Sequence, residues 1–214
     1  MSGSWGMLLA LGAFHGINPG MGWLFAVALG MQENRAAAVW RAILPIGVGH
    51  ACAVAAAVAL GMIAGVVLPI DELRWAVAAI LIALGILRLV RHRHPRYGSM
   101  RIGAGGLTIW SFLIATAHGA GLMVLPIWLG MSAAAAGDHS AHLRAVTGTA
   151  TLGSGLAAIA VHSGSYLIVT AAIASIVFHK LGVGMLRKAW INLDLIWAAA
   201  LVATGTLTIL LPLA

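Results

Sequence analysis

The chain has 214 residues, of which 62% are hydrophobic and only 8% are charged. Soluble domains carry about 25% charged residues, so this composition excludes an ordinary soluble domain, and the hydrophobicity also excludes an intrinsically disordered chain. The net charge is +7, from 12 Lys and Arg against 5 Asp and Glu. These basic residues lie in short stretches between apolar runs, so membrane topology explains them and we expect no nucleic-acid partner.

Charged residues divide the chain into six apolar segments. A transmembrane helix needs about 20 residues, so six spans use nearly the whole chain and leave no room for a soluble catalytic domain. We therefore predict an all-α integral membrane protein with six transmembrane helices and no enzymatic activity. In chain order the segments are 5–31, 41–68, 75–90, 107–131, 151–178 and 189–211.

The basic residues are distributed unequally between the two sides that six spans would define. One side holds only Arg74 and Arg144, and the other holds the remaining ten Lys and Arg. Because loops rich in Lys and Arg stay in the cytoplasm, we expect a multi-pass protein of the bacterial cytoplasmic (inner) membrane with both termini external. The ten are Arg35, Arg41, Arg88, Arg91, Arg93, Arg96, Arg101, Lys180, Arg187 and Lys188.

The two halves of the chain share short motifs, which predicts an internal repeat. Segment one contains Phe14-His15-Gly16 and segment four contains Ala117-His118-Gly119, while His50 and His162 occupy segments two and five. Two halves of three helices each must have opposite orientations in the membrane, as in many transporters. We therefore expect one membrane domain built as a 3+3 inverted repeat, with residues 1–101 forming the first half and 102–214 the second.

Four histidines, His15, His50, His118 and His162, lie inside apolar segments. At a rise of about 1.5 Å per residue, all four approach the midplane of a hydrocarbon core about 30 Å thick. Polar side chains at that depth face the bundle interior or a cavity, and neutral imidazole is a common ligand of first-row metals. We predict a shared metal site; the alternative is that each histidine only bonds a neighbouring helix.

Two further polar residues are candidates for a substrate path or proton relay. Asp194 is the only acid inside an apolar segment, and an intramembrane carboxylate is a functional candidate, although it could instead form a fixed ion pair. Asn18 precedes Pro19, which removes a backbone donor and disfavours helix at Asn18. A helix broken there would expose backbone groups beside His15, as in transporter binding sites; the alternative is a kinked, tightly packed helix.

Sulfur ligands offer a second kind of metal site. Cys52, Met21 and Met123 lie close in sequence to the histidines, and such ligands favour copper(I). However, side chains two or five residues apart do not share a helix face, so we favour packing roles for them.

The stretch His15-Gly16-Ile17-Asn18-Pro19-Gly20-Met21 resembles the first-helix signature of the nickel/cobalt permease family, His-x-x-Asp-x-Asp-His. Gly49-His50-Ala51 resembles the Gly-His-Ser element of that family's second helix. The wider relatives are small polytopic exporters of the LysE-like superfamily, which share a three-plus-three helix plan. The resemblance covers the first two helices, and more loosely the fourth, and it implies a cation permease or exporter without a nucleotide site.

Only His15 and His50 match that family's motif. Asn18 stands at its first Asp, Gly20 at its second Asp and Met21 at its second His. The anionic half of the family's metal site is therefore replaced by neutral residues.

These observations together predict a membrane permease or exporter for a small cation, with a transition metal as the favoured class and protons as competitors for the histidines. One alternative is a haem-binding electron-transfer subunit, with two histidines as axial ligands. Another is a structural or assembly subunit of a larger membrane complex. The expected partners are the lipid bilayer and the cation, and a homo-oligomer or a membrane-complex partner is also compatible with the sequence.

Overall fold

The computed structural model describes residues 2–90, 103–136, 149–181 and 193–210, and this part of the chain is helical with no strand. The prediction of an all-α protein is therefore confirmed. The elements are α1 (Ser2–Ile17), η1 (Pro19–Met21), α2 (Trp23–Gln32), α3 (Ala36–Val67), α4 (Ile70–Val90), α5 (Ala104–Ala117), α6 (Ala120–Ala136), α8 (Thr149–Ile176), the π-type turn η3 (Val177–Leu181) and α9 (Leu193–Leu210).

Three of these helices are long and apolar enough to cross a membrane: Ala36–Gly65, Asp71–Val90 and Leu152–Lys180. A fourth candidate is the pair Ala104–Ala117 and Ala120–Met131, which is bent by 62°. The shorter helices Trp23–Gln32 and Leu195–Leu210 are also apolar. The described helices thus give three or four candidate spans, which is consistent with a multi-pass membrane protein.

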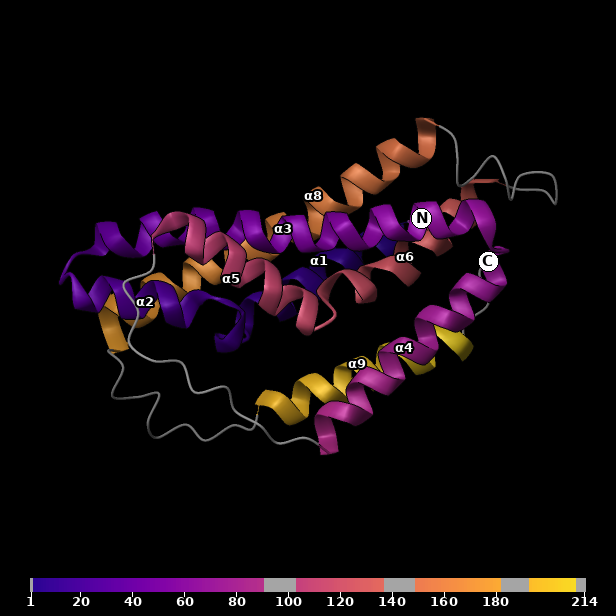
Figure 1. The fold of residues 1–214 in the computed structure, drawn as a ribbon. Coiled ribbons are helices and arrows are strands. Elements are labelled where there is room, and N and C mark those ends of the chain that lie inside the picture. The colour runs from indigo at the N-terminus through magenta and orange to yellow at the C-terminus, as the bar shows by residue number, and fades with distance from the viewer. Residues whose placement is uncertain (1, 91–102, 137–148, 182–192, 211–214) are drawn as a thin grey trace.

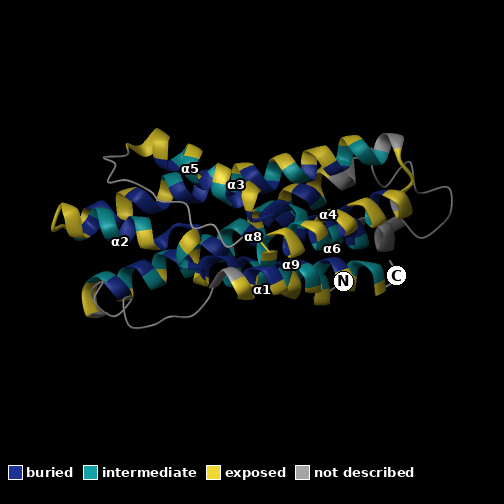
Figure 2. Ribbon diagram, turned by 60° about the horizontal axis from the view of Figure 1, so that its bottom comes forward, coloured by how far each residue is buried: buried dark blue, intermediate teal, exposed yellow. Residues whose placement is uncertain are grey.

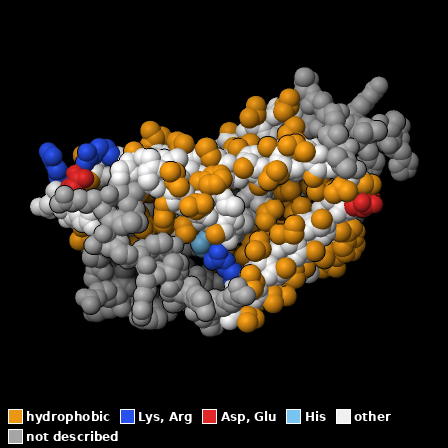
Figure 3. Space-filling view, viewed as in Figure 1, with side chains coloured by type: hydrophobic (Ala, Val, Ile, Leu, Met, Phe, Trp, Pro, Cys, Tyr) orange, Lys and Arg blue, Asp and Glu red, His pale blue; other side chains and the backbone are white. Residues whose placement is uncertain are grey.

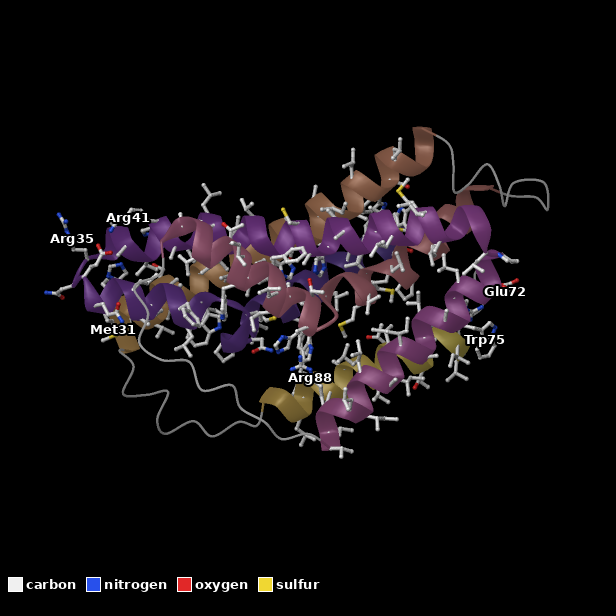
Figure 4. The ribbon with its side chains drawn as sticks, viewed as in Figure 1. Met31, Arg35, Arg41, Glu72, Trp75 and Arg88 are labelled. Carbon is white, nitrogen blue, oxygen red and sulfur yellow. The ribbon has the colours of Figure 1, made fainter. Side chains whose placement is uncertain are left out.

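The helices form a bundle in which α4 and α9 lie side by side and cross the others at an angle (Figure 1). In the rest of the bundle α1 packs on α8, and α3 packs on both α5 and α8. The N-terminal end of α1 and the C-terminal end of α9 lie toward the same end of the bundle in Figure 1. Figure 4 places Arg35 and Arg41 at the opposite end, far from Glu72 and Trp75.

Two of the predicted segments are broken near their middle. Segment one is interrupted after Ile17, where Asn18 leaves the helix and Gly22 takes φ 141°, a value that L side chains rarely adopt. The break predicted beside Pro19 is therefore present. Segment four is interrupted at His118 and Gly119, where Gly119 has φ 73°, whereas Pro126 is accommodated inside α6.

Apolar side chains cover the outside of the bundle as well as its core. Residues such as Leu60, Ile63 and Ile168 are well exposed on α3 and α8, and Figure 2 shows exposed positions along the outer sides of the helices. Figure 3 shows an apolar surface with most charged side chains near the ends. Soluble monomers rarely expose apolar areas this extensive, so this surface is suited to lipid.

Candidate functional site

Three of the four predicted histidines meet in the core, each from a different helix. His15 comes from α1, His50 from α3 and His162 from α8, and none has any exposed surface. The ring centroid of His15 lies 5.5 Å from that of His50 and 5.0 Å from that of His162. The rings of His50 and His162 are stacked with centroids 5.5 Å apart. We call these three residues the histidine cluster.

Glycines allow the helices that carry the cluster to approach closely. A Cβ added to Gly16 of α1 would lie 2.7 Å from the carbonyl oxygen of Tyr166 on α8, a distance that real Cβ atoms essentially never show. Gly12, one turn earlier, would collide with the backbone of His162 itself. These two small residues, four positions apart, therefore allow α1 to pack against α8, which places His15 beside His162.

Hydrogen bonds fix which ring nitrogens face the centre of the cluster. His15 Nδ1 donates to the carbonyl oxygen of Leu11 at 2.7 Å, so its Nε2 carries the lone pair. That Nε2 is buried and has no hydrogen-bond partner in the described structure. The Nε2 atoms of His50 and His162 lie 3.3 Å apart and share a hydrogen bond.

His118 lies at the second break and is separated from the histidine cluster by Trp197. It repeats the local geometry of His15, since its Nδ1 donates to the carbonyl oxygen of Ile114, also four residues earlier, at 2.8 Å. Its ring centroid is 5.6 Å from that of Trp197, and the Trp197 ring in turn lies 4.6 Å from His15. The structure thus brings together three of the four predicted ligands, with the fourth behind an aromatic side chain.

Two aromatic residues that the sequence analysis did not select enclose the histidine cluster. Tyr166 stacks on His50 with centroids 3.8 Å apart, and its hydroxyl donates to the carbonyl oxygen of Met21 at 2.5 Å. Trp197 contacts His15 and stacks on Phe14. A sequence signal existed for Tyr166, because it follows His162 by one helical turn and so shares its face. Trp197 stood out only as a tryptophan away from the segment ends.

Arg88 is a further residue that the sequence analysis treated only as a topology marker. It lies in the last turn of α4, and Figure 4 shows it part-way along the length of the bundle, away from both ends. Its guanidinium donates to the carbonyl oxygen of Ala117 at 2.7 Å and lies 3.5 Å from His118 Nε2. A cation is thus placed at the C-terminal end of α5, where the helix dipole favours it.

The other residues selected from the sequence do not belong to the histidine cluster. Asn18 is buried at the first break, and its Oδ1 accepts a hydrogen bond from the Gly20 N–H at 2.9 Å, which caps η1. Asp194 belongs to the first turn of α9, but its side chain lies outside the described part of the structure. Cys52 is exposed on α3, whereas Met21 and Met123 belong to the apolar core.

Among the residues that the structure describes, no three or more His, Cys, Asp or Glu side chains are arranged to hold a metal ion. Within the histidine cluster the reason is visible, because two of the Nε2 atoms are bonded to each other. A cation bound by all three residues would have to replace that bond.

Comparisons of the chain with protein-family models, with curated proteins and with solved structures give no match. The functional argument therefore rests on the site itself.

Proposed function

We propose that this protein is a membrane transporter that moves a small cation, with a transition metal as the favoured class, through the histidine cluster. One observation carries the proposal: three fully buried imidazoles from three helices converge beside a broken helix, with the Nε2 of His15 unpaired. An unpaired polar atom in an apolar core is costly, and a bound ligand would satisfy it. Discontinuous helices are a common feature of transporter binding sites.

The geometry of the cluster fits two metal ligands and supplies a third nearby. Two nitrogens bound to one tetrahedral zinc at 2.0–2.1 Å would lie about 3.3–3.4 Å apart, and the Nε2 atoms of His50 and His162 are 3.3 Å apart. His15 is oriented by its bond to Leu11, the kind of outer contact that metal-binding histidines use. Because only neutral imidazole binds metal, protons would compete with the cation.

Six spans arranged as a 3+3 inverted repeat remain part of the proposal. They would be α1 with α2, then α3, α4, α5 with α6, α8 and α9. The contacts support this arrangement, because α3 packs on its counterpart α8 at His50 and His162, and α4 packs on its counterpart α9. His15 and His118 each lie next to a helix break and bond the carbonyl oxygen four residues earlier, and this shared local geometry supports the repeat as well. Alternating access would then follow from rocking of one half against the other.

The proposed location is the bacterial inner membrane with both termini external. It rests on the excess of Lys and Arg in the loops of one side. A proton path that includes Asn18 and Asp194 belongs to the same proposal.

The haem alternative is less favoured, because Tyr166 and Trp197 pack directly against the rings of His50 and His15.

The test is element analysis and an optical spectrum of the detergent-purified protein, followed by uptake of Ni²⁺, Co²⁺, Zn²⁺ and Cu⁺ into proteoliposomes. We expect a bound or transported metal, and a loss on the order of 10–100-fold or more in affinity for His15→Ala, His50→Ala and His162→Ala. His179→Ala is the matched control, because His179 is exposed in η3.

Several outcomes would contradict the proposal. A haem absorption band would favour the electron-transfer alternative, and stoichiometric co-purifying proteins with no uptake would favour the assembly subunit. Uptake by the three cluster variants that equals uptake by His179→Ala would leave the histidines with a packing role only.

A further inference from the structure

We propose that Trp197 is a gate: its indole closes the histidine cluster off from the more exposed side of the bundle, where His118 lies. This inference rests on the proposed function, for which it supplies one of the two barriers that alternating access requires. It assigns to α9 a role that its sequence did not indicate.

The position of the indole supports this role. Trp197 is 1% exposed, and its ring meets the edges of both His15 and His118, at interplanar angles of 81° and 71°. Phe14 stacks on it with centroids 5.2 Å apart and an interplanar angle of 7°. A path from His118 to His15 therefore meets an aromatic side chain that is packed on both sides.

The histidines on the two sides of this indole differ in their exposure to the surface. The three residues of the histidine cluster have no exposed surface, whereas His118 is 8% exposed and Arg88 beside it is half-buried. Figure 3 shows a histidine and a basic side chain together on the face where α4 and α9 meet the rest of the bundle. The side of Trp197 that carries His118 is thus the side closer to the surface.

A polar contact sets the closed position of the gate. Trp197 Nε1 donates to the carbonyl oxygen of His118 at 2.9 Å, and His118 is the residue that ends α5 at the second break. Gly119 follows with φ 73°, a conformation that glycine adopts without strain. A change of the backbone at this break would move the acceptor of the indole, so opening of the helix and opening of the gate are coupled.

The test measures exchange of the imidazole C2–H with deuterated water for each histidine, by mass spectrometry of the full-length protein in lipid vesicles. In the natural protein we expect slow exchange at His15, His50 and His162 and faster exchange at His118. In Trp197→Ala we expect exchange at His15 to rise to the rate of His118. In Trp197→Phe, which keeps an aromatic ring, His15 should stay protected.

Trp128→Ala is the matched control, because Trp128 is fully buried and its Nε1 donates to a side chain of another helix, Ser154. Exchange at His15 should be unchanged by it. Protection of His15 in Trp197→Ala, or an equal rise in Trp128→Ala, would overturn the gate. The readout needs no transported cation, so a failed uptake assay with the expected exchange pattern would reject the proposed function and retain the barrier.

Discussion

Gly85 and Gly205 hold equivalent positions on α4 and α9 and contact each other's helix in the same way. A Cβ on Gly85 would lie 2.9 Å from the carbonyl oxygen of Ala198, and a Cβ on Gly205 would lie 2.9 Å from that of Ala78. The buried residues follow the same order on the two helices: Val77, Ala78, Leu81 and Gly85 on α4, and Trp197, Ala198, Leu201 and Gly205 on α9. The two helices are therefore antiparallel with a local twofold relationship between them.

Gly85→Ala and Gly205→Ala should destabilise the protein by similar amounts. Each added methyl meets the backbone and a side chain of the facing helix, Val202 for Gly85 and Ile82 for Gly205, and overpacking costs about 1–3 kcal/mol. Thermal unfolding in detergent measures the effect. Gly164→Ala is the control, because a Cβ there meets nothing within 4 Å; unequal losses at the two sites would contradict the local twofold relationship.

Gly22→Ala should destabilise the protein by straining the backbone at the first helix break. Gly22 has φ 141°, and its Cβ would also press on the side chain of Ile46. A non-glycine residue in such a conformation costs about 1–3 kcal/mol. We expect a lower unfolding temperature than for Gly105→Ala, whose Cβ would meet nothing within 4 Å. Equal unfolding temperatures would mean that the backbone at the break relaxes freely.

Tyr166→Phe and Tyr166→Ala should separate two roles of this side chain. The phenylalanine variant keeps the ring and loses the hydroxyl that donates to the Met21 carbonyl, and interhelical hydrogen bonds in membranes contribute about 0.6 kcal/mol on average. The alanine variant also loses the ring that stacks on His50, and removal of a buried aromatic side chain costs about 3–5 kcal/mol. Thermal unfolding of both variants, with cation uptake alongside, tests this order; a loss as large in Tyr166→Phe would contradict it.

Arg88→Ala should lower the stability of the protein. It removes the donor to the Ala117 carbonyl at the end of α5 and the contact with His118, and a lone favourable charge at a helix end contributes about 0.3–1 kcal/mol, more where it is partly buried. Arg41→Ala is the control, since Arg41 pairs with Glu33 on the surface, where such pairs contribute about 0–1 kcal/mol. Thermal unfolding of both variants in detergent measures the effect; a loss in Arg88→Ala no larger than that in Arg41→Ala would contradict a stabilising role of Arg88 at the end of α5.

The helices and the histidine cluster were the most predictable parts of the structure. Apolar runs bounded by charges predicted 41–68 and 75–90, and α3 and α4 lie at Ala36–Val67 and Ile70–Val90. Pro19 predicted the first break because proline acts locally on the backbone. The common depth of His15, His50, His118 and His162, which depends on the helical rise, predicted that they form one site. Three of them meet, whereas His118 packs against Trp197.

The residues around the cluster could not be found in the same way. Depth counted from a helix end treats every helix as perpendicular to the membrane, whereas α4 crosses the bundle at an angle and carries Arg88 to the end of α5 (Figure 4). The position of Trp197 between His15 and His118 depends on how α9 packs, which is a tertiary property. The sequence around Gly119 does not by itself specify the second break, because a glycine is compatible with both a helix and a turn.

The hydrogen bond between His50 of α3 and His162 of α8 makes these two imidazoles chemically different. Two like nitrogens that face each other at 3.3 Å can be joined by only one proton, since one imidazole must donate and the other must accept. The donor is therefore the tautomer with its proton on Nε2, and the acceptor is the tautomer with its proton on Nδ1. Transfer of the shared proton alone would leave an imidazolate and an imidazolium, so an exchange of the two roles also needs proton shifts at the Nδ1 atoms. The helices α3 and α8 are thereby distinguished by the tautomers of the histidines that they carry.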